Sequence, residues 1–290
     1  MRSDARYPSM MFIASLLVFG TNGVVASTIG LDGIRIVLLR SMIGAVALVA
    51  VFLVMGNRFT FHRDRRTFML MAVSGASMGL SWMCLFEAYD SAGVGLASLE
   101  YYCGPVIVMA LSPLLFGERL TARRALGFAV VFIGIVAVGM DGVSGSADAG
   151  GLLLGAMSAV LLAVMIVTNK MAVGVRGMEN PVVQLVFAFA TVAAVSLVTG
   201  DAAMAVAPSD VPGILVLGLV NTALGCVLYF TSMGRIRSQT VAVCGYIEPL
   251  TAVVLAALVL GEPMGPVQVL GAAMVIGGAL FCETGAVASE

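Results

Sequence analysis

Two acidic residues stand close to prolines inside long apolar stretches of this sequence. Glu100 lies shortly before Pro105 in ASLEYYCGPVIVMAL, and Glu248 directly precedes Pro249 in YIEPLTAVVL. A carboxylate exposed to hydrocarbon costs about 3 kcal/mol or more unless it is paired, protonated or next to water. Each proline also leaves the carbonyl four residues before it without a helical hydrogen bond. Together these residues predict a polar cavity in which the carboxyl groups bind a substrate ammonium or a coupling proton, with the prolines as hinges.

Packing offers a second account of the same residues. Prolines are tolerated in membrane helices for structural reasons alone, and Glu100 then only neutralises Arg40. Arg40 lies about six residues into an apolar stretch, deep enough to require a partner. We expect it either to form a charge pair with Glu87 or Glu100, or to attract a substrate carboxylate.

The residues next to Glu100 indicate which side chains share its surroundings. At about 100° per residue, Glu100 and Gly104 lie on one face of a helix, whereas Tyr101 and Tyr102 point to nearly opposite sides. One tyrosine is therefore expected to line the cavity with Glu100, and Tyr101 is the candidate. Tyr246 is the corresponding candidate in the later apolar stretch.

An aromatic stripe and two amides complete the candidate substrate-binding residues. Trp82, Phe86 and Tyr89 follow one another at helical spacing, so they form either an apolar wall for a substrate or ordinary packing, with Tyr89 more typical of a membrane interface. Asn22 and Asn221 are uncharged polar residues in apolar stretches, where they contact a ligand or form hydrogen bonds between helices.

The composition is that of a membrane protein. Of the 290 residues, 60% are hydrophobic and only 11% are charged, and the mean hydropathy is +1.08. A soluble domain carries about 25% charged residues. The net charge of −1 argues against a nucleic-acid partner. The expected surroundings are a lipid bilayer, the cytoplasmic (inner) membrane, which the chain crosses many times.

No residue pattern points to a metal, a cofactor or catalysis. The five cysteines lie in apolar runs without the spacing of a zinc site, and the single histidine, His62, lies among charged loop residues. The sequence lacks the GxxxxGK[ST] phosphate loop, so ATP-driven transport by this chain is not expected. We expect no metal, no cofactor and no enzyme.

A bilayer core about 30 Å thick requires about 20 apolar residues for each crossing helix. Ten such runs are present, which predicts an all-α membrane protein of ten transmembrane helices. Their limits are 9–29, 34–55, 67–89, 92–116, 121–140, 150–170, 181–200, 212–233, 239–260 and 265–282.

The charges of the short loops orient these spans. Cytoplasmic loops carry an excess of Lys and Arg. With the N-terminus in the cytoplasm, every Lys and Arg other than Arg35 and Arg40 of the second span lies in an inner segment. Both termini are therefore predicted to be cytoplasmic. The inner basic residues are Arg2, Arg6, Arg58, Arg63, Arg65, Arg66, Arg119, Arg123, Arg124, Lys170, Arg176, Arg235 and Arg237.

The two halves of the chain repeat each other. A shift of 144 positions places GERLTARRALGFAVVFIGIVAV over GEPMGPVQVLGAAMVIGGALFC, with seven of 22 positions identical, and aligns Tyr102 with Tyr246 and Pro105 with Pro249. Each half contains five spans, residues 1–144 and 145–290. Because five is odd, the second half is inverted relative to the first. Inverted repeats are typical of secondary transporters, which expose a central site to either side in turn.

The segments LEYYCGPVIVMALSPLLFGERLT and YIEPLTAVVLAALVLGEPM, within ten spans duplicated as five plus five, resemble the EamA-type branch of the drug/metabolite transporter superfamily. The resemblance covers nearly the whole chain, and the fourth span is similar to that of threonine/homoserine exporters. It implies an exporter of small metabolites, with amino acids or related amines as the first candidates.

Two other functions fit parts of the sequence. A flippase for a lipid-linked small molecule differs only in a cavity that opens sideways to lipid, and an intramembrane enzyme requires a catalytic cluster that the sequence does not show. The GxxxG spacings Gly75 with Gly79 and Gly151 with Gly155 indicate close helix packing and leave a homodimer open.

Overall fold

The computed structural model describes residues 6–116, 122, 125–127, 129–134, 137, 148–172, 174–175, 177–200, 205–233, 244–245, 247–262 and 265–284. Regular structure in these residues is helical. In chain order the helices are α1 (Arg6–Gly20), α2 (Asn22–Ala26), α3 (Gly33–Val54), η1 (Phe61–Arg63), α4 (Arg65–Ala92), α5 (Val94–Tyr101), α6 (Cys103–Phe116), α8 (Ala149–Met171), α9 (Glu179–Thr199), α10 (Val211–Leu215), η2 (Val216–Leu224), α11 (Gly225–Met233), α13 (Ile247–Val259) and α14 (Pro266–Thr284).

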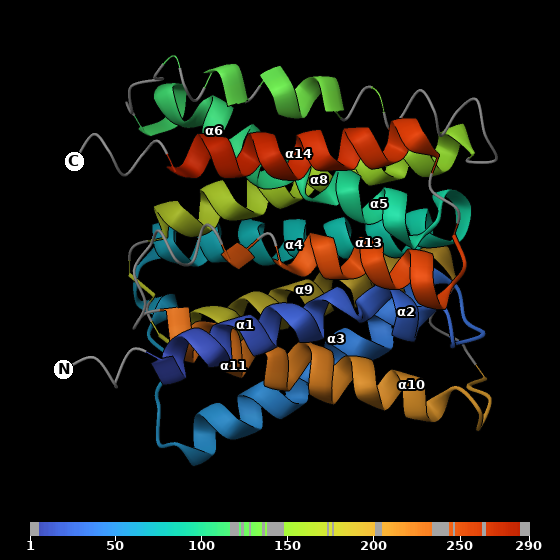
Figure 1. Cartoon of the computed structure of the whole chain (residues 1–290). Coiled ribbons are helices and arrows are strands. Elements are labelled where there is room, and N and C mark those ends of the chain that lie inside the picture. Colours follow the sequence, from blue (N-terminus) through green and yellow to red (C-terminus); the bar gives the residue numbers. More distant parts are fainter. Residues whose placement is uncertain are drawn as a thin grey trace.

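The prediction of ten spans is confirmed. Among the described residues, six helices are long and apolar enough to cross a membrane, and four shorter apolar helices accompany them. The helices lie side by side along a common direction, and α1 begins on the same side of the bundle on which α14 ends (Figure 1). We call this side the inner end, following the predicted orientation, and the opposite side the outer end.

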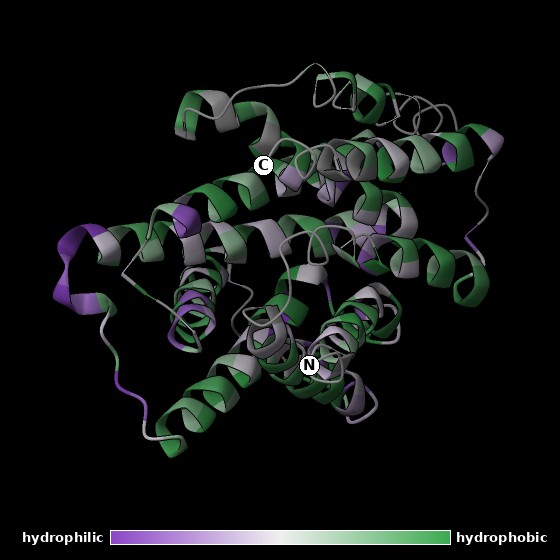
Figure 2. Cartoon of the chain, turned by 60° about the vertical axis from the view of Figure 1, so that its left-hand side comes forward, coloured by the Kyte–Doolittle hydropathy of each residue, from purple (hydrophilic) through white to green (hydrophobic). Residues whose placement is uncertain are grey.

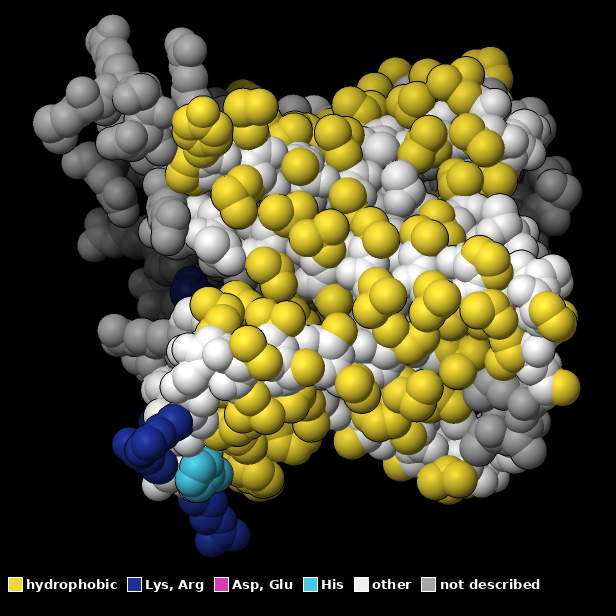
Figure 3. All heavy atoms as spheres, turned by 90° about the horizontal axis from the view of Figure 1, so that it is seen from below, with side chains coloured by type: hydrophobic (Ala, Val, Ile, Leu, Met, Phe, Trp, Pro, Cys, Tyr) yellow, Lys and Arg dark blue, Asp and Glu magenta, His cyan; other side chains and the backbone are white. Residues whose placement is uncertain are grey.

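The lateral surface of the bundle is apolar. The helices are mostly hydrophobic along their length, whereas hydrophilic residues gather at their ends (Figure 2). Side chains such as Val54, Leu114 and Val198 are exposed there. Lys and Arg side chains appear at one end of the face seen in Figure 3, consistent with the exposed Arg63 of η1 and Arg65, the first residue of α4. Lipid contact accounts for this distribution, because hydrocarbon does not solvate charge.

Side-chain caps and a glycine set the ends of the helices. Asp32 begins α3 by accepting a hydrogen bond from the backbone N–H of Arg35 at 2.9 Å. Asp64 begins α4 in the same way, accepting from the N–H of Thr67 at 2.8 Å. Gly93 separates α4 from α5 with a φ of 88°, a conformation that residues with a Cβ rarely adopt.

Helices of one half pack mainly on helices of the other half, and the contacts are reciprocal. In the 144-residue register α1 with α2 corresponds to α8, α3 to α9, α4 to the segment from α10 to α11, and α6 to α13. The contact of α4 with α8 has its counterpart in α11 with α1, and that of α4 with α9 has its counterpart in η2 with α3. Such pairing indicates an approximate two-fold relation between the repeats.

The direction of α8 shows that the repeats are inverted. The backbone N–H of Asp148, just before α8, donates to the carbonyl of Ser91, near the end of α4, at 3.2 Å. Helix α4 begins at the inner end, as α1 does, and ends at the outer end (Figure 1). Helix α8 therefore runs from the outer to the inner end, opposite to α1.

Candidate functional site

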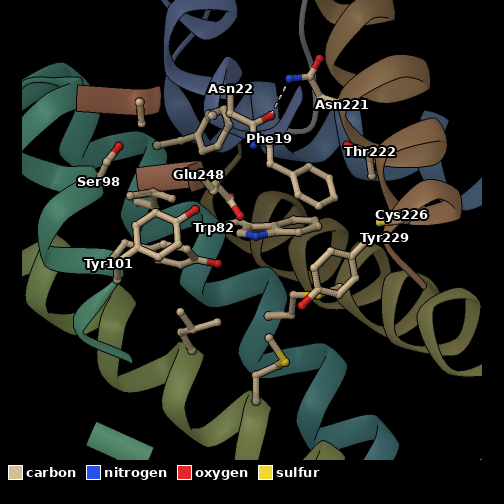
Figure 4. Close-up of a pocket in the computed structure, with 18 of the residues that line it drawn as sticks. Phe19, Asn22, Trp82, Ser98, Tyr101, Asn221, Thr222, Cys226, Tyr229 and Glu248 are labelled. Atoms are coloured by element: carbon tan, nitrogen blue, oxygen red, sulfur yellow. Dashed lines mark hydrogen bonds between the residues drawn. The ribbon is translucent and has the colours of Figure 1, made fainter. Parts of the chain in front are cut away.

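A cavity of about 590 Å³ lies inside the bundle, between the two repeats. Its wall takes residues from α1, α2, α3, α4, α5 and α6 of the first repeat and from α8, α9, η2, α11 and α13 of the second. Figure 4 shows the side chains that converge there. A volume of this size accommodates a small organic molecule.

Arg40 supplies a buried cation to this cavity. Its side chain is 3% exposed, and its Nε and Nη2 donate to Thr222 Oγ1 at 3.3 and 3.2 Å. The guanidinium lies over the rings of Trp82 and Phe86, 4.7 and 5.0 Å from their centroids. Cation–π contacts and the threonine hydroxyl hold the group in one place.

The charge pair expected for Arg40 is not formed. In the described part of the chain no carboxylate oxygen lies within 4.0 Å of its guanidinium. One proposed partner, Glu87, accepts a hydrogen bond from the backbone N–H of Ile34 at 3.0 Å. The other, Glu100, faces a different helix. The spacing of the sequence predicts that these residues lie at similar depths in the membrane. It does not predict whether their side chains face one another.

Glu248 lines the cavity from the first turn of α13. Its carboxyl group comes toward Trp82 and Tyr101 in Figure 4, and it faces the hydroxyl of Tyr102. Its backbone carbonyl lies 3.0 Å from the position of a Cβ on Gly20, so α13 and α1 approach closely at this point.

Glu100 is not part of the cavity wall, which corrects the expectation that the two acids share one chamber. Its side chain is 8% exposed, and its Oε2 has no hydrogen-bond partner in the described structure. It packs on Gly155 of α8, where an added Cβ would collide with Oε2. Gly104, in α6, also packs on α8, against Leu162. Helix α8 therefore covers both residues.

Tyr101 and Tyr102 both line the cavity, whereas only one of them was expected to do so. The cause is a break in the fourth span, where α5 ends at Tyr101 and α6 begins at Cys103. Continuous helical spacing therefore does not apply across Tyr102. The two rings meet edge-on with centroids 5.3 Å apart. The candidate Tyr246 lies outside the described residues.

Both candidate hinge prolines lie in the first turns of helices. Pro105 is in the first turn of α6 and lines the cavity, and Pro249 is in the first turn of the described part of α13. A proline is well tolerated there, because the N–H groups of a first turn have no helical acceptor. Whether the prolines act as hinges concerns motion and stays a prediction.

Aromatic side chains form much of the wall. Trp82, Phe86 and Tyr89 of α4 all line the cavity. Phe19 and Tyr229, whose ring centroids are 6.0 Å apart, face them from α1 and α11 and were missed from the sequence. Isolated aromatic residues in apolar spans give no signal of their own that separates a cavity wall from packing.

The two candidate amides join η2 to the break between α1 and α2. Asn221 Nδ2 donates to the carbonyl of Val18 at 2.8 Å and to Thr21 Oγ1 at 2.9 Å. It also donates to Asn22 Oδ1 at 3.1 Å (Figure 4). Both asparagines also line the cavity. Segment η2 is a π-helix, in which Thr222 Oγ1 donates to the carbonyl of Leu217, five residues earlier, at 2.7 Å. Single π-helical turns are frequently found at functional sites.

At its inner end the cavity meets a group of polar side chains from α8 and α9. Asn169, Lys170 and Gln184 line it there, and Lys170 is exposed. Asn169 Nδ2 donates to Asn180 Oδ1 at 2.9 Å, and Gln184 Nε2 donates to the same oxygen at 2.6 Å. The rule that selected Asn22, a polar residue in an apolar run, would have found Asn169 and Gln184 too.

At the outer end, carboxylates of the second repeat bind backbone of the first. Glu262 Oε1 accepts from the N–H of Val94 at 2.7 Å, and its Oε2 accepts from that of Gly95 at 2.9 Å. Asp210 Oδ1 accepts from the N–H of Gly30 at 3.2 Å. These bonds join the repeats beyond the last lining residues on that side.

Comparisons with known proteins agree on one family. The model of the EamA-like transporter family matches residues 7–140 and again residues 149–283. An uncharacterized transporter of Archaeoglobus fulgidus is 26% identical, over 95% of this chain and 96% of its own. A probable terminal-alkyne amino-acid exporter of Streptantibioticus cattleyicolor is 26% identical, over 88% of this chain and 86% of its own. A crystal structure with a TM-score of 0.69 covers all of both chains at 20% identity, which shows a shared fold.

Proposed function

The chain belongs to the EamA-like transporter family, and from that membership we propose that it is a secondary transporter that exports amino acids or related amines by alternating access. The observation that carries the proposal is the cavity between the inverted repeats, which combines an acidic group, Glu248, with an aromatic wall. An acid among aromatic rings suits a small organic cation or the ammonium group of an amino acid. The name of the relative from Streptantibioticus cattleyicolor supports the same class of cargo.

Alternating access is supported by the different contacts at the two ends of the cavity. At the outer end, hydrogen bonds that Glu262 and Asp210 accept from backbone N–H groups of the first repeat join the repeats. At the inner end, the exposed Lys170 belongs to the lining. A conformation that is held shut outside and reached from inside is the one that an exporter needs in order to load its cargo. Movement of one repeat against the other then exposes the cavity to the outside.

Counterflow in proteoliposomes tests this proposal. Vesicles are loaded with each member of a panel of amino acids and small amines, and uptake of the same labelled compound is followed. We expect saturable uptake for at least one amino acid or amine, and a loss of tenfold or more in Glu248→Gln, because the amide cannot balance an ammonium charge. Asp32→Asn, which changes a cap on α3, is the matched control and should transport normally. Translocation of a lipid-linked substrate, with no flux of any panel member, would overturn the proposal.

A further inference from the structure

Arg40 is a buried cation whose partner is missing from the described structure. Its side chain is 3% exposed, and the described carboxylates all lie more than 4.0 Å from its guanidinium. Helix α3 packs on α4, α9, α10 and η2. Of the acids on these helices, Glu87 accepts from the N–H of Ile34, and Glu179 accepts from Thr60 and Phe61. Asp90, near the end of α4, is exposed. Glu248 of α13 faces Arg40 only at longer range.

The guanidinium also has hydrogen-bond donors that the described residues do not fully use. Arginine has five N–H groups in a planar fork. Nε and Nη2 of Arg40 share a single acceptor, Thr222 Oγ1, and Nη1 has no acceptor in the described part of the chain. Since Arg40 lines the cavity, these donors are available to a molecule inside it. Carboxylate is the group that matches this fork with two parallel hydrogen bonds.

The surroundings hold the guanidinium ready for such a group. Trp82 and Phe86 present ring faces to it at 4.7 and 5.0 Å. The hydroxyl of Thr222 donates to the carbonyl of Leu217 at 2.7 Å, so its lone pairs are directed to Arg40. A site held in advance loses little freedom when the ligand arrives.

A buried charge that lacks an opposite charge is strongly unfavourable. A ligand that supplies the opposite charge removes this cost, and the free energy gained favours its binding. We propose that Arg40 is the carboxylate subsite of the transport cavity, positioned by Thr222, and that the cargo is a zwitterion that carries both a carboxylate and an ammonium group. This inference rests on the proposed function and narrows its cargo from amines in general to amino acids.

Glu248 completes the arrangement from the other repeat. Its carboxyl group comes toward Trp82 in Figure 4, and Arg40 lies over the same indole. The guanidinium of Arg40 and the carboxyl group of Glu248 therefore both lie near the indole ring of Trp82. An amino acid placed there satisfies Arg40 with its carboxylate and Glu248 with its ammonium group, and the aromatic wall receives its side chain. An amine without a carboxylate leaves Arg40 unpaired.

The test compares an amino acid with the amine that lacks its carboxylate. The probe pair is taken from the amino acid with the highest counterflow in the panel, for example L-phenylalanine and phenethylamine. Each probe competes against labelled amino acid in wild-type proteoliposomes. We expect the amino acid to compete at a concentration at least tenfold lower. In Arg40→Gln the ratio of the competing concentrations of amine and amino acid should fall to about one.

Thr222 provides a milder pair of variants if Arg40→Gln does not fold. Thr222→Val should raise the KM for the amino acid about threefold or more and leave the KM for the amine unchanged, whereas Thr222→Ser should behave as wild type. The inference is overturned if the amine competes as well as the amino acid in wild type, or if folded variants lose both fluxes equally. Absence of flux for amino acids and amines alike would instead refute the proposed function.

Discussion

Loss of the Glu262 carboxylate should loosen the outer end of the cavity. Glu262 belongs to the loop between α13 and α14 of the second repeat, and its two oxygens bind the first two N–H groups of α5 in the first repeat. The substitution Glu262→Gln keeps the size of the side chain. It leaves one oxygen acceptor for two donors, and it removes the negative charge from the positive end of the helix dipole.

The size of the effect follows from these contacts. A hydrogen bond to a charged group contributes about 1.5–3 kcal/mol, and charge at a helix terminus contributes about 0.3–1 kcal/mol. Glu262 is only partly buried, so water replaces some of the loss. We take about 1.5 kcal/mol as the net change, which shifts the equilibrium between outer-closed and outer-open conformations about tenfold.

Cysteine accessibility measures this shift. Ser98 lines the cavity near its outer end, so Ser98→Cys, in a protein whose five native cysteines are replaced, reports on access from outside. A membrane-impermeant maleimide added to whole cells should label it about ten times faster in Glu262→Gln. Asp32→Asn removes a charge from the same end but caps its own helix, and should not change the rate. Equal labelling with and without Glu262→Gln would refute the assignment of these bonds to outer closure.

Three further changes have definite expected outcomes. Glu100→Gln should keep counterflow within twofold of wild type, because the side chain packs outside the cavity; a tenfold loss would contradict that placement. Gly79→Leu should lower the free energy of unfolding by about 1–3 kcal/mol through overpacking, and with it the thermal unfolding temperature, since a Cβ there lies 2.7 Å from a backbone carbonyl of α9. The control Gly277→Leu, with open space around its Cβ position, should change the unfolding temperature little. Hydrogen bonds from Thr67 hold the pKa of Asp64 below its ordinary value of 3.8. This cap stabilises α4 fully above the ordinary pKa and is lost as the pH falls through the lowered one. Protection of the first amides of α4 against hydrogen exchange, taken relative to their intrinsic exchange rate at each pH, should therefore fall only in acid, and Asp64→Ala should remove that pH dependence.

Span positions and the repeat were predictable, because they depend on properties that are local in the sequence. Hydropathy over about 20 residues reflects the thickness of the bilayer. The repeat is visible because the Gly-Glu pairs and the prolines, Pro105 and Pro249, keep one register. The break before Pro105 also has a local cause, since proline disturbs the helical hydrogen bonds that precede it.

What covers each helix face was not predictable. Glu100 of α5 and Gly104 of α6 both contact α8, yet only the folded structure shows that this helix covers them. The isolation of Arg40 likewise depends on where every acid points after folding. The π-helical segment that brings Thr222 to Arg40 was not predictable either, because no periodic signal in a single sequence separates a short π-helix from an α-helix.

Trp82 gives the most direct measurement of the central claim, that the cavity between the repeats is where cargo binds. It is the only tryptophan of the chain and it lines the cavity, so the intrinsic tryptophan fluorescence of the protein comes from the site itself. The amino acid that shows the highest counterflow should change this fluorescence saturably, with a Kd close to its half-saturating concentration in counterflow, and Arg40→Gln should weaken that binding. Saturable counterflow of an amino acid that leaves the Trp82 emission unchanged at all concentrations would contradict the claim.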